Sequence, residues 1–335
     1  MPSSIRSINL GALYGIHAFD YNTKGDVRID SNYISNFSSF NADSTKGAII
    51  AGVWIQGAFF AGEDVGTNNI RVKNNIITDM HTGGYPDGHV TGILYAGNDA
   101  FSYLFVEDNQ ISHLYSYGDV YTDNYGITIR GRATIQRNKI NCLKNLQGHN
   151  YVYGIYYEGA IVCKNNAISV GCAKQGGFTA YGISGNPGLF GPSSFYNNSI
   201  HVTARYPACM NVGDSSVIKN NILSAKSTLT NASGQVLYCP TNCMLGNNIY
   251  ALQSTNVNSP NPYSFTIPDT SSRGVLNAQF VNECGDNGVW DMRISPYSLA
   301  INFGKANAMV TDDIHGNPRP ITGNIDAGCY QSNVI

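Results

Sequence analysis

Apolar and polar residues alternate in short segments that recur along most of the chain. In each segment an apolar residue lies three positions before an asparagine and another lies two positions after it, which is typical of short strands with one buried face. These segments contain Asn32, Asn75, Asn109, Asn138, Asn166, Asn198, Asn221 and Asn248. From Asn75 onward the asparagines are 34, 29, 28, 32, 23 and 27 positions apart. The chain is therefore a repeat protein with units of roughly 28 residues.

We expect each of these asparagines at a tight corner between two short strands. Asparagine tolerates the left-handed backbone conformation that such a corner can need. When the units stack, each side-chain amide can bond the asparagines above and below it, as in the amide ladders of cross-β assemblies. The pattern thus predicts an asparagine ladder with a structural role.

A second unit, Tyr-Gly-Ile or Thr-Gly-Ile, falls between the asparagine segments and supplies a third strand. Its copies begin at Tyr14, Thr91, Tyr125, Tyr153 and Tyr181. Three strands and three corners per unit, without helical periodicity, predict an all-β fold, a right-handed parallel β-helix. Parallel strands stack about 4.8 Å apart, so residues one unit apart are near neighbours.

The regular pattern ends near residue 250. Ser259-Pro-Asn-Pro-Tyr263 and Ile267-Pro-Asp269 mark irregular loops. We therefore expect β-helix rungs over residues 1–250. Residues 251–335 would form the last rungs and an irregular C-terminal cap of the same domain.

The end of the chain carries a distinctive block of short motifs. It contains Asn277–Asn282, Asp291–Pro296, Ser298–Gly304, Thr311–Pro320 and Asn324–Gln331. This block resembles the closing segment of bacterial secreted right-handed β-helix proteins of the pectin-lyase-like superfamily. With the asparagine segments, the resemblance covers nearly the whole chain.

The resemblance implies a β-helix fold, an exported bacterial origin and a structural role for the closing block. It does not select an activity, because the superfamily includes polysaccharide lyases, glycoside hydrolases and adhesins. The chain departs from the usual block at Cys329, where Ala is usual, and at Gln331, where Glu is usual. Ser298-Leu299 also replaces a Ser-Pro pair.

The composition points to an exported protein with neutral ligands. Charged residues make up only 13% of the chain, about half the usual quarter. Neutral polar groups and 22 tyrosines must therefore cover the surface, which suits sugars. The net charge of -2 argues against nucleic acid or an anionic membrane as the main partner.

No apolar run is long enough to span a membrane, so we expect no membrane span. The segment Met1-Pro-Ser-Ser-Ile-Arg6 does not have the pattern of a signal peptide. We therefore expect a fragment of a longer secreted or cell-surface protein, with the export signal outside this chain, and we expect a monomer.

The 8 cysteines contain no zinc-binding pattern. Cys239 and Cys243 are the one close pair and could form a small disulfide loop. We interpret the cysteines instead as buried free thiols that pack like small apolar side chains. Cysteine usage then does not identify the compartment.

Candidate chemistry concentrates in the loops that precede the Tyr-Gly-Ile strands, where function is often carried on a rigid scaffold. These loops contain Asp79, His81, Tyr85, Asp87, His89, His113, Tyr115, Tyr117, Asp119, Tyr121, Asp123, Lys144, His149 and Tyr151. On the strands themselves, Thr128, Arg130, Tyr156 and Glu158 are expected to face outward. Arg130 and Glu158 lie one unit apart, so we expect them to be stacked neighbours.

These residues suggest a saccharide site. The residues predicted to bind substrate are His81, Tyr85, Asp87, His89, His113, Tyr121, Tyr151 and Tyr156. A lyase needs a cation that neutralises a sugar carboxylate, for which we consider Arg130, and a base, for which we consider Lys144 or His149.

A hydrolase needs two carboxylates instead, and the candidates are Asp87, Asp119, Asp123 and Glu158. The predicted catalytic set is therefore Arg130, Glu158, Lys144, His149 and Asp123.

Each of these features also has a plainer interpretation. Arg130 and Glu158 can be an ordinary exposed ion pair. Tyr125, Tyr153 and Tyr181 can form a structural stack instead of a binding platform. No cofactor is implied with certainty, although the Asp-rich loops could hold Ca²⁺.

The sequence therefore favours a polysaccharide lyase or glycoside hydrolase that acts on a plant, algal or host glycan. The alternative is a noncatalytic cell-surface glycan-binding or adhesin module. A weaker alternative is a trimeric tail-spike-like fibre.

Overall fold

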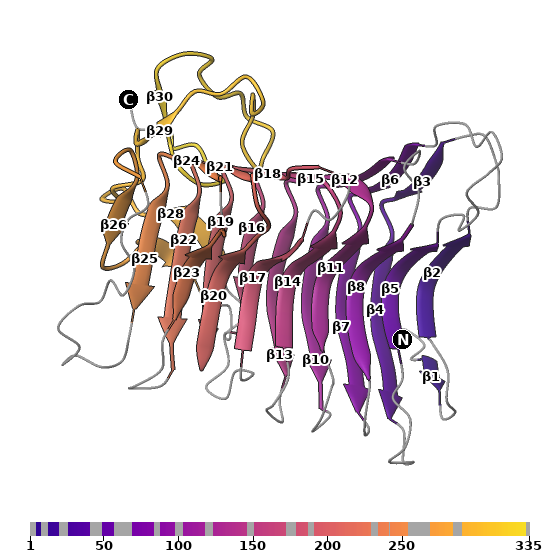
Figure 1. Cartoon of the computed structure of the whole chain (residues 1–335). Helices are drawn as coiled ribbons and strands as arrows, with labels where there is room; N and C mark the ends of the chain where they lie inside the picture. Colours follow the sequence, from indigo (N-terminus) through magenta and orange to yellow (C-terminus); the bar gives the residue numbers. More distant parts are fainter. Residues whose placement is uncertain are drawn as a thin grey trace.

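The chain forms a right-handed parallel β-helix, as predicted (Figure 1). Its rungs stack on one another, and their strands form three parallel sheets. The computed structural model describes residues 5–7, 13–19, 26–40, 49–56, 69–83, 88–97, 103–117, 123–145, 151–171, 179–186, 191–228, 234–240, 242–253, 269–283 and 290–332. Within these ranges the secondary structure is β-strand, turn and irregular chain. No helix in this part of the chain is long and apolar enough to cross a membrane.

Three sheets form the walls. Sheet A contains β1 (Ile5–Ser7), β4 (Tyr33–Phe40), β7 (Ile76–Gly83), β10 (Gln110–Ser116), β13 (Lys139–Asn145), β16 (Ala167–Val170), β19 (Ser199–Ala204), β22 (Ile222–Ser227), β25 (Ile249–Gln253) and β26 (Arg273–Val275). Sheet B contains β2 (Leu13–Phe19), β5 (Ile49–Gln56), β8 (His89–Ala96), β11 (Asn124–Arg130), β14 (Tyr151–Glu158), β17 (Thr179–Asn186), β20 (Tyr206–Asn211) and β23 (Gln235–Tyr238). Sheet C contains β3 (Val27–Asp30), β6 (Asn69–Lys73), β9 (Tyr103–Glu107), β12 (Arg132–Gln136), β15 (Ile161–Lys164), β18 (Ser194–Tyr196), β21 (Val217–Lys219) and β24 (Met244–Gly246).

Inward-facing residues of the three sheets fill one continuous apolar core. Ile127 and Ile155 of sheet B are fully buried, as is Ile140 of sheet A. The glycine of each Tyr-Gly-Ile unit lets these two sheets approach. A Cβ atom on Gly126 would lie 2.5 Å from the carbonyl oxygen of Gly154 and 2.7 Å from Cγ2 of Ile140.

The predicted asparagine ladder is present at the corner between sheets C and A. The side-chain amide of Asn109 donates to Oδ1 of Asn138 at 2.9 Å and to the carbonyl of Val72 at 2.9 Å. The backbone N–H of Asn109 donates to the same Oδ1 at 3.0 Å. The ladder therefore satisfies buried backbone groups as well as its own amides.

The left-handed residue at this corner is not the ladder asparagine, so that part of the prediction is wrong. It is the preceding residue, such as Asp108 with φ 57° or Arg137 with φ 55°. The side chains at this preceding position can reach the outer surface, and those of Arg137 and Asp108 pair with each other at 2.7 Å. The ladder asparagine follows this left-handed residue, and its side-chain amide points into the buried corner.

The C-terminal segment contains β27 (Phe280–Asn282), β28 (Asp291–Ile294), β29 (Gly304–Lys305) and β30 (Asn324–Ile325), which pair in two antiparallel ribbons. Figure 1 shows its last part, in yellow, beside the strands of sheet C. Left-handed corner residues hold it there, because Asn165 donates to the carbonyl of Asp312 at 2.7 Å and Asn220 to that of Lys305 at 2.8 Å. Phe280 of β27 and Met292 of β28 instead belong to an apolar cluster with Ile222 of sheet A.

A buried arginine organises the closing block. Arg319 donates to Oε1 of Gln331 at 2.9 Å and to the carbonyls of Asp312 and Gly328 at 2.9 and 2.8 Å. Gln331, a departure from the usual block, thus supplies an acceptor through its neutral amide. These contacts give Arg319 and Gln331 a structural role in the closing block.

The cysteines follow two patterns. Buried free thiols are present, as expected, at Cys142, Cys163, Cys209 and Cys329. Cys239 and Cys243 form a disulfide, so the interpretation as free thiols is wrong for this pair. The short connection between β23 and β24 brings both cysteines to one corner. Cys172 and Cys284 lie outside the described residues.

Candidate functional site

Arg130 and Glu158 are stacked neighbours at the end of β11 and β14, as predicted from their spacing. Nε of Arg130 lies 3.1 Å from Oε2 of Glu158, and the two side chains are 59% and 45% exposed. The hydroxyl of Tyr156 donates to Oε1 of Glu158 at 2.9 Å. Because both charged groups are exposed, the pair contributes little to stability.

Three tyrosines on the outer face of sheet B form a parallel stack. The ring centroids of Tyr125 and Tyr153 are 5.0 Å apart, and those of Tyr153 and Tyr181 are 5.1 Å apart. The three rings therefore stack from one rung to the next, at the positions where the unit repeats. The neighbouring rings cover both faces of the middle ring, Tyr153, so a ligand can reach only its edge.

Two further tyrosines flank this stack. The ring of Tyr156 meets Tyr125 and Tyr153 edge-on, at centroid distances of 5.9 and 5.4 Å. The ring of Tyr151 lies 6.0 Å from that of Tyr153 and is 45% exposed. We refer to Tyr125, Tyr151, Tyr153, Tyr156 and Tyr181 together as the tyrosine face.

The phenols of Tyr125, Tyr153 and Tyr156 stay protonated near neutral pH. Burial raises the pKa of Tyr156, and the hydrogen bond to Glu158 raises it further. Burial and the adjacent Asp123 likewise raise the pKa values of Tyr125 and Tyr153. These hydroxyls are therefore neutral hydrogen-bonding groups and poor bases.

Asp123 directly precedes β11, at the opposite end of that strand from Arg130. Its carboxylate accepts from the hydroxyl of Tyr125 at 2.9 Å and from the backbone N–H of Tyr151 at 3.1 Å. His89 starts β8 next to it, with its ring 6.2 Å from that of Tyr125. At about 3.3 Å per residue, the length of β11 separates Asp123 from Arg130 by roughly 20 Å.

Lys144, His81 and His113 lie on sheet A, away from Arg130. His81, Tyr115 and Lys144 occupy one row across β7, β10 and β13. The ammonium of Lys144 is 6.0 Å from the centroid of the Tyr115 ring, and the His81 ring meets Tyr115 edge-on at 5.0 Å. A corner of the solenoid thus separates the proposed cation, Arg130, from the proposed base, Lys144.

The histidines of sheet A sit beside a backbone irregularity. His113 has a φ of 53°, and the equivalent Asp79 has a φ of 54°. Nδ1 of His113 lies 3.3 Å from the hydroxyl of Thr78. Burial lowers the pKa of His81, and repulsion from His113 lowers it further against the opposing effect of Asp79. A neutral His81 is the expected form near pH 7.

Several predicted site residues lie outside the described part of the chain. They are Tyr85, Asp87, Asp119, Tyr121 and His149. Within the described ranges, no group of three or more His, Cys, Asp or Glu side chains could hold a metal ion. Asp87 and Asp119, two of the acids in the Asp-rich loops considered for Ca²⁺, are among those outside.

No protein-family model matches this chain, and no curated protein matches its sequence. The likeness to β-helix proteins of the pectin-lyase-like superfamily therefore stays a resemblance of motifs. Function has to be argued from the surfaces themselves.

The sequence reasoning missed an aromatic group on the same face of sheet B. The rings of His17 and Trp54 stack at 4.5 Å, and Tyr14 lies 4.5 Å from Trp54. Register places Trp54 in one outward row with Thr128 and Tyr156. The signal was present in Ala51-Gly-Val-Trp54, a copy of the glycine unit in which Ala replaces Tyr.

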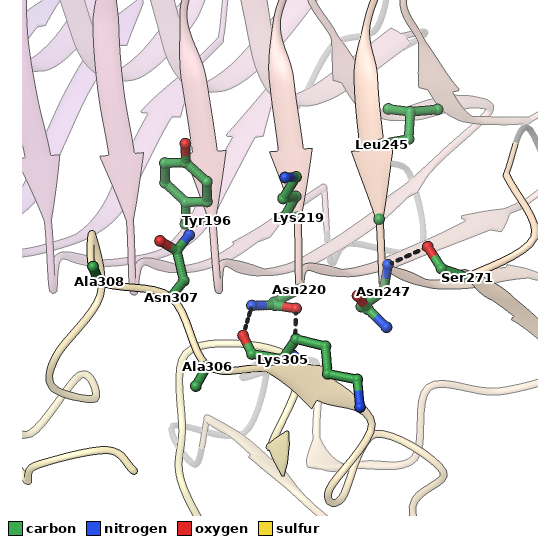
Figure 2. A pocket seen from close by; sticks show the side chains of 11 residues that line it. Tyr196, Lys219, Asn220, Leu245, Asn247, Ser271, Lys305, Ala306, Asn307 and Ala308 are labelled. Carbon is green, nitrogen blue, oxygen red and sulfur yellow. Dashed lines mark hydrogen bonds between the residues drawn. The ribbon is translucent and has the colours of Figure 1, made fainter. Parts of the chain in front are cut away.

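A pocket of about 450 Å³ lies between sheet C and the C-terminal segment (Figure 2). The residues that line it are Tyr196, Lys219, Asn220, Leu245, Gly246, Asn247, Ser271, Lys305, Ala306, Asn307 and Ala308. A smaller pocket of about 160 Å³ lies near the first rungs of sheet C, beside Arg28, Arg71 and Phe105. The sequence did not indicate either pocket.

Proposed function

We propose that this chain is a carbohydrate-binding β-helix protein that holds a neutral saccharide on its tyrosine face. The observation that carries the proposal is the contact of five tyrosine rings on three adjacent strands, β11, β14 and β17. A tyrosine combines an apolar ring with a hydrogen-bonding tip, which matches the C–H faces and hydroxyls of a sugar.

Rigidity supports the proposal. Tyrosine offers a large contact area for few rotatable bonds, so ordering it costs little on binding. The parallel stack of Tyr125, Tyr153 and Tyr181 holds its rings in place before a ligand arrives. The exposed ring of Tyr151 and the partly buried ring of Tyr156 then provide accessible aromatic surface beside the stack.

The charges on this face favour a neutral ligand. Glu158 neutralises Arg130, and Asp123 adds one further carboxylate. Among the described charged residues of β11 and β14 and of position 123, carboxylates therefore outnumber cations. A polyuronate would be repelled by this arrangement, whereas the hydroxyls of a neutral glycan can donate to both carboxylates.

A polysaccharide lyase or glycoside hydrolase is the second candidate, favoured by the convergence of Arg130, Glu158 and Tyr156. The described residues support it less. Asp123 and Glu158 lie at opposite ends of the sheet B strands, roughly 20 Å apart along them. The two catalytic carboxyl groups of a hydrolase are roughly 5 to 9.5 Å apart. The raised pKa of Tyr156 makes it a poor base for a lyase. Catalysis would thus depend on Asp87, Asp119 or His149.

Extracellular residence, at a bacterial surface or in secretion, belongs to the same proposal. The 13% charged residues, the Cys239–Cys243 disulfide and the resemblance to pectin-lyase-like proteins support it. On this view the chain is a noncatalytic surface or adhesion module.

Isothermal titration calorimetry against a panel of neutral and acidic oligosaccharides tests the proposal. We expect a neutral glycan to bind, and Tyr151→Ala and Tyr156→Ala each to weaken it about tenfold, as for central aromatic contacts. Tyr33→Ala is the matched control, because Tyr33 is 68% exposed on sheet A. Equal losses for all three variants, or binding confined to acidic glycans, would refute the proposal.

Product formation separates the two candidates. A lyase creates an unsaturated sugar that absorbs ultraviolet light, and a hydrolase releases reducing ends. We expect neither signal from any glycan that binds. A signal that disappears in Arg130→Ala would establish the enzyme instead.

A further inference from the structure

A second aromatic group lies on the outer face of sheet B, toward its first rungs, and the function proposed above does not use it. The rings of His17 of β2 and Trp54 of β5 stack at a centroid distance of 4.5 Å, with an interplanar angle of 10°. The ring of Tyr14 lies 4.5 Å from that of Trp54 and 4.8 Å from that of His17. We refer to Tyr14, His17 and Trp54 together as the tryptophan group.

The side chains of the tryptophan group are partly exposed. His17 covers one face of the Trp54 indole, whereas the Tyr14 ring is tilted by 56° against it and does not stack on it. β2 is the outermost described strand of sheet B, so no described strand pairs with it on the side away from β5. The group therefore offers aromatic surface of the kind that contacts the C–H faces and hydroxyls of a sugar.

The tryptophan group and the tyrosine face share two outward rows of sheet B. One row begins at Tyr14 and reaches Tyr125 three rungs later. The other row contains His17 and Trp54 and reaches Tyr156 three rungs after Trp54. Figure 1 shows β5, β8, β11 and β14 side by side in this order. At about 4.8 Å per rung, roughly 14 Å separates Trp54 from Tyr156 along the solenoid axis.

The positions between the two groups are neutral. In the two shared rows they are Ala51, Thr91, Leu94 and Thr128. Arg130 and Glu158 lie in a different row of sheet B, which continues through Ala96 and Gln56. A neutral chain can therefore cross these rungs without burying a charged side chain.

The spacing of the two groups selects the length of the ligand. A disaccharide is too short to contact both Trp54 and Tyr156, which are roughly 14 Å apart along the axis. An oligosaccharide of several units can contact both groups at once. Its second contact is then intramolecular, which raises the overall affinity without any new chemistry.

We propose that the tryptophan group is a second subsite for the neutral saccharide of the tyrosine face. The ligand is an extended oligosaccharide chain that crosses the strands along the solenoid axis, from Trp54 to Tyr156. This inference rests on the function proposed above and adds the length and the direction of the ligand.

Calorimetry with short and long neutral chains tests the second subsite. The probes are cellobiose, xylobiose and mannobiose, and the six-unit chain of each series. For the series that binds, we expect the six-unit chain to bind at least tenfold more tightly than the disaccharide. Trp54→Ala should remove most of this difference and leave the affinity for the disaccharide within about twofold, which also shows that the variant is folded. Trp54→Phe keeps an aromatic ring and should retain most of the difference.

The indole signals locate the contact. The chain has 2 tryptophans, and Trp290 packs against the apolar cluster of the C-terminal segment, so its signal is an internal reference. In NMR of protein labelled at tryptophan, the six-unit chain should shift the Trp54 signal, and the disaccharide should leave it unchanged. Trp54→Phe assigns this signal.

Two kinds of failure can be told apart. Equal affinity for both lengths, or an unchanged Trp54 signal, while Tyr151→Ala and Tyr156→Ala still weaken binding, would overturn the extended chain and leave the proposed function standing. Absence of binding by every neutral chain, short or long, would refute the function proposed for the tyrosine face and this inference with it.

Discussion

Two stacks of like side chains run along this solenoid, the asparagine ladder at the corner between sheets C and A and the tyrosine stack on sheet B. The ladder asparagines from Asn75 to Asn248 are fully buried, and each amide from Asn75 to Asn221 bonds the asparagine of the next rung, as Asn109 bonds Asn138 at 2.9 Å. The tyrosines touch only through their rings, 5.0 Å apart between Tyr125 and Tyr153, and remain partly exposed. Repetition alone therefore does not identify function. Exposure distinguishes the stack that stabilises the fold from the one that a ligand can reach.

The largest expected effect comes from interrupting the ladder. Asn138→Ala leaves the buried N–H of Asn109 and the carbonyl of Val106 without their bonds to this amide. At about 1–3 kcal/mol for each unsatisfied buried group, we expect the free energy of unfolding to fall by roughly 3–5 kcal/mol. Chemical denaturation measures it, with Asn69→Ala on an exposed position as the control. Similar losses in both variants would show that the ladder is dispensable.

Glycine at the tyrosine stack has a steric role that the same assay can isolate. In Gly126→Ala the new methyl group would meet the Gly154 carbonyl of the next rung at 2.5 Å and Cγ2 of Ile140 on sheet A at 2.7 Å, so sheets A and B must separate locally. We expect a loss of about 1–3 kcal/mol from overpacking. Gly246→Ala, where contacts are ordinary, should cost far less. If the order of the two losses were reversed, close approach of the sheets would not explain the Tyr-Gly-Ile unit.

A buried histidine makes the interior sensitive to pH in a way that the tyrosine face is not. His201 of β19 bonds Ser224 and Thr203, and burial lowers its pKa to about 3, with a smaller contribution from Lys226. The unfolded chain, with an ordinary pKa near 6.5, therefore takes up the proton first as the pH falls.

The free energy of unfolding should consequently decrease below about pH 6.5. At about 1.4 kcal/mol per pH unit, the loss between pH 6.5 and 5 is roughly 2 kcal/mol. Denaturation at both pH values measures it. His201→Gln removes the titrating group, so its loss over this interval should be smaller by that amount. Equal pH dependence in both proteins would contradict a neutral buried His201.

The smallest effect on stability is expected at the exposed ion pair. Removing Arg130, Glu158 or both should change the free energy of unfolding by less than about 1 kcal/mol. A double-mutant cycle in chemical denaturation measures the coupling between them. A coupling energy of several kcal/mol would mean that this pair has a structural role and is not an available part of the surface.

The sequence predicted the fold because its periodicity is visible in residue types. Asn138 and its equivalents recur at readable spacings, and the same spacing placed Arg130 beside Glu158. The left-handed backbone conformation at the corner was harder to assign from the sequence. The left-handed corner residue is Asp108 in one rung and Arg137 in the next, and neither residue type identifies it.

The surfaces were harder to predict, because they depend on how separate parts of the chain meet. Lys144 lies close to Tyr151 in sequence, but a corner puts it on another sheet from Arg130. Trp54 was missed because Ala51 interrupts the tyrosine pattern. The pocket beside sheet C forms only where the C-terminal segment docks, through contacts such as that of Asn220 with Lys305, and the spacing of the repeats does not show where that segment docks.

The central claim is that the tyrosine face, unlike the asparagine ladder, is a binding surface for neutral sugars. NMR of protein labelled only at tyrosine, titrated with neutral oligosaccharides, tests this most directly. We predict shifts at Tyr125, Tyr151, Tyr153, Tyr156 and Tyr181, and none at the buried Tyr95 and Tyr250. Shifts confined to exposed tyrosines elsewhere, such as Tyr33 and Tyr297, or no shift with any neutral glycan, would contradict the account.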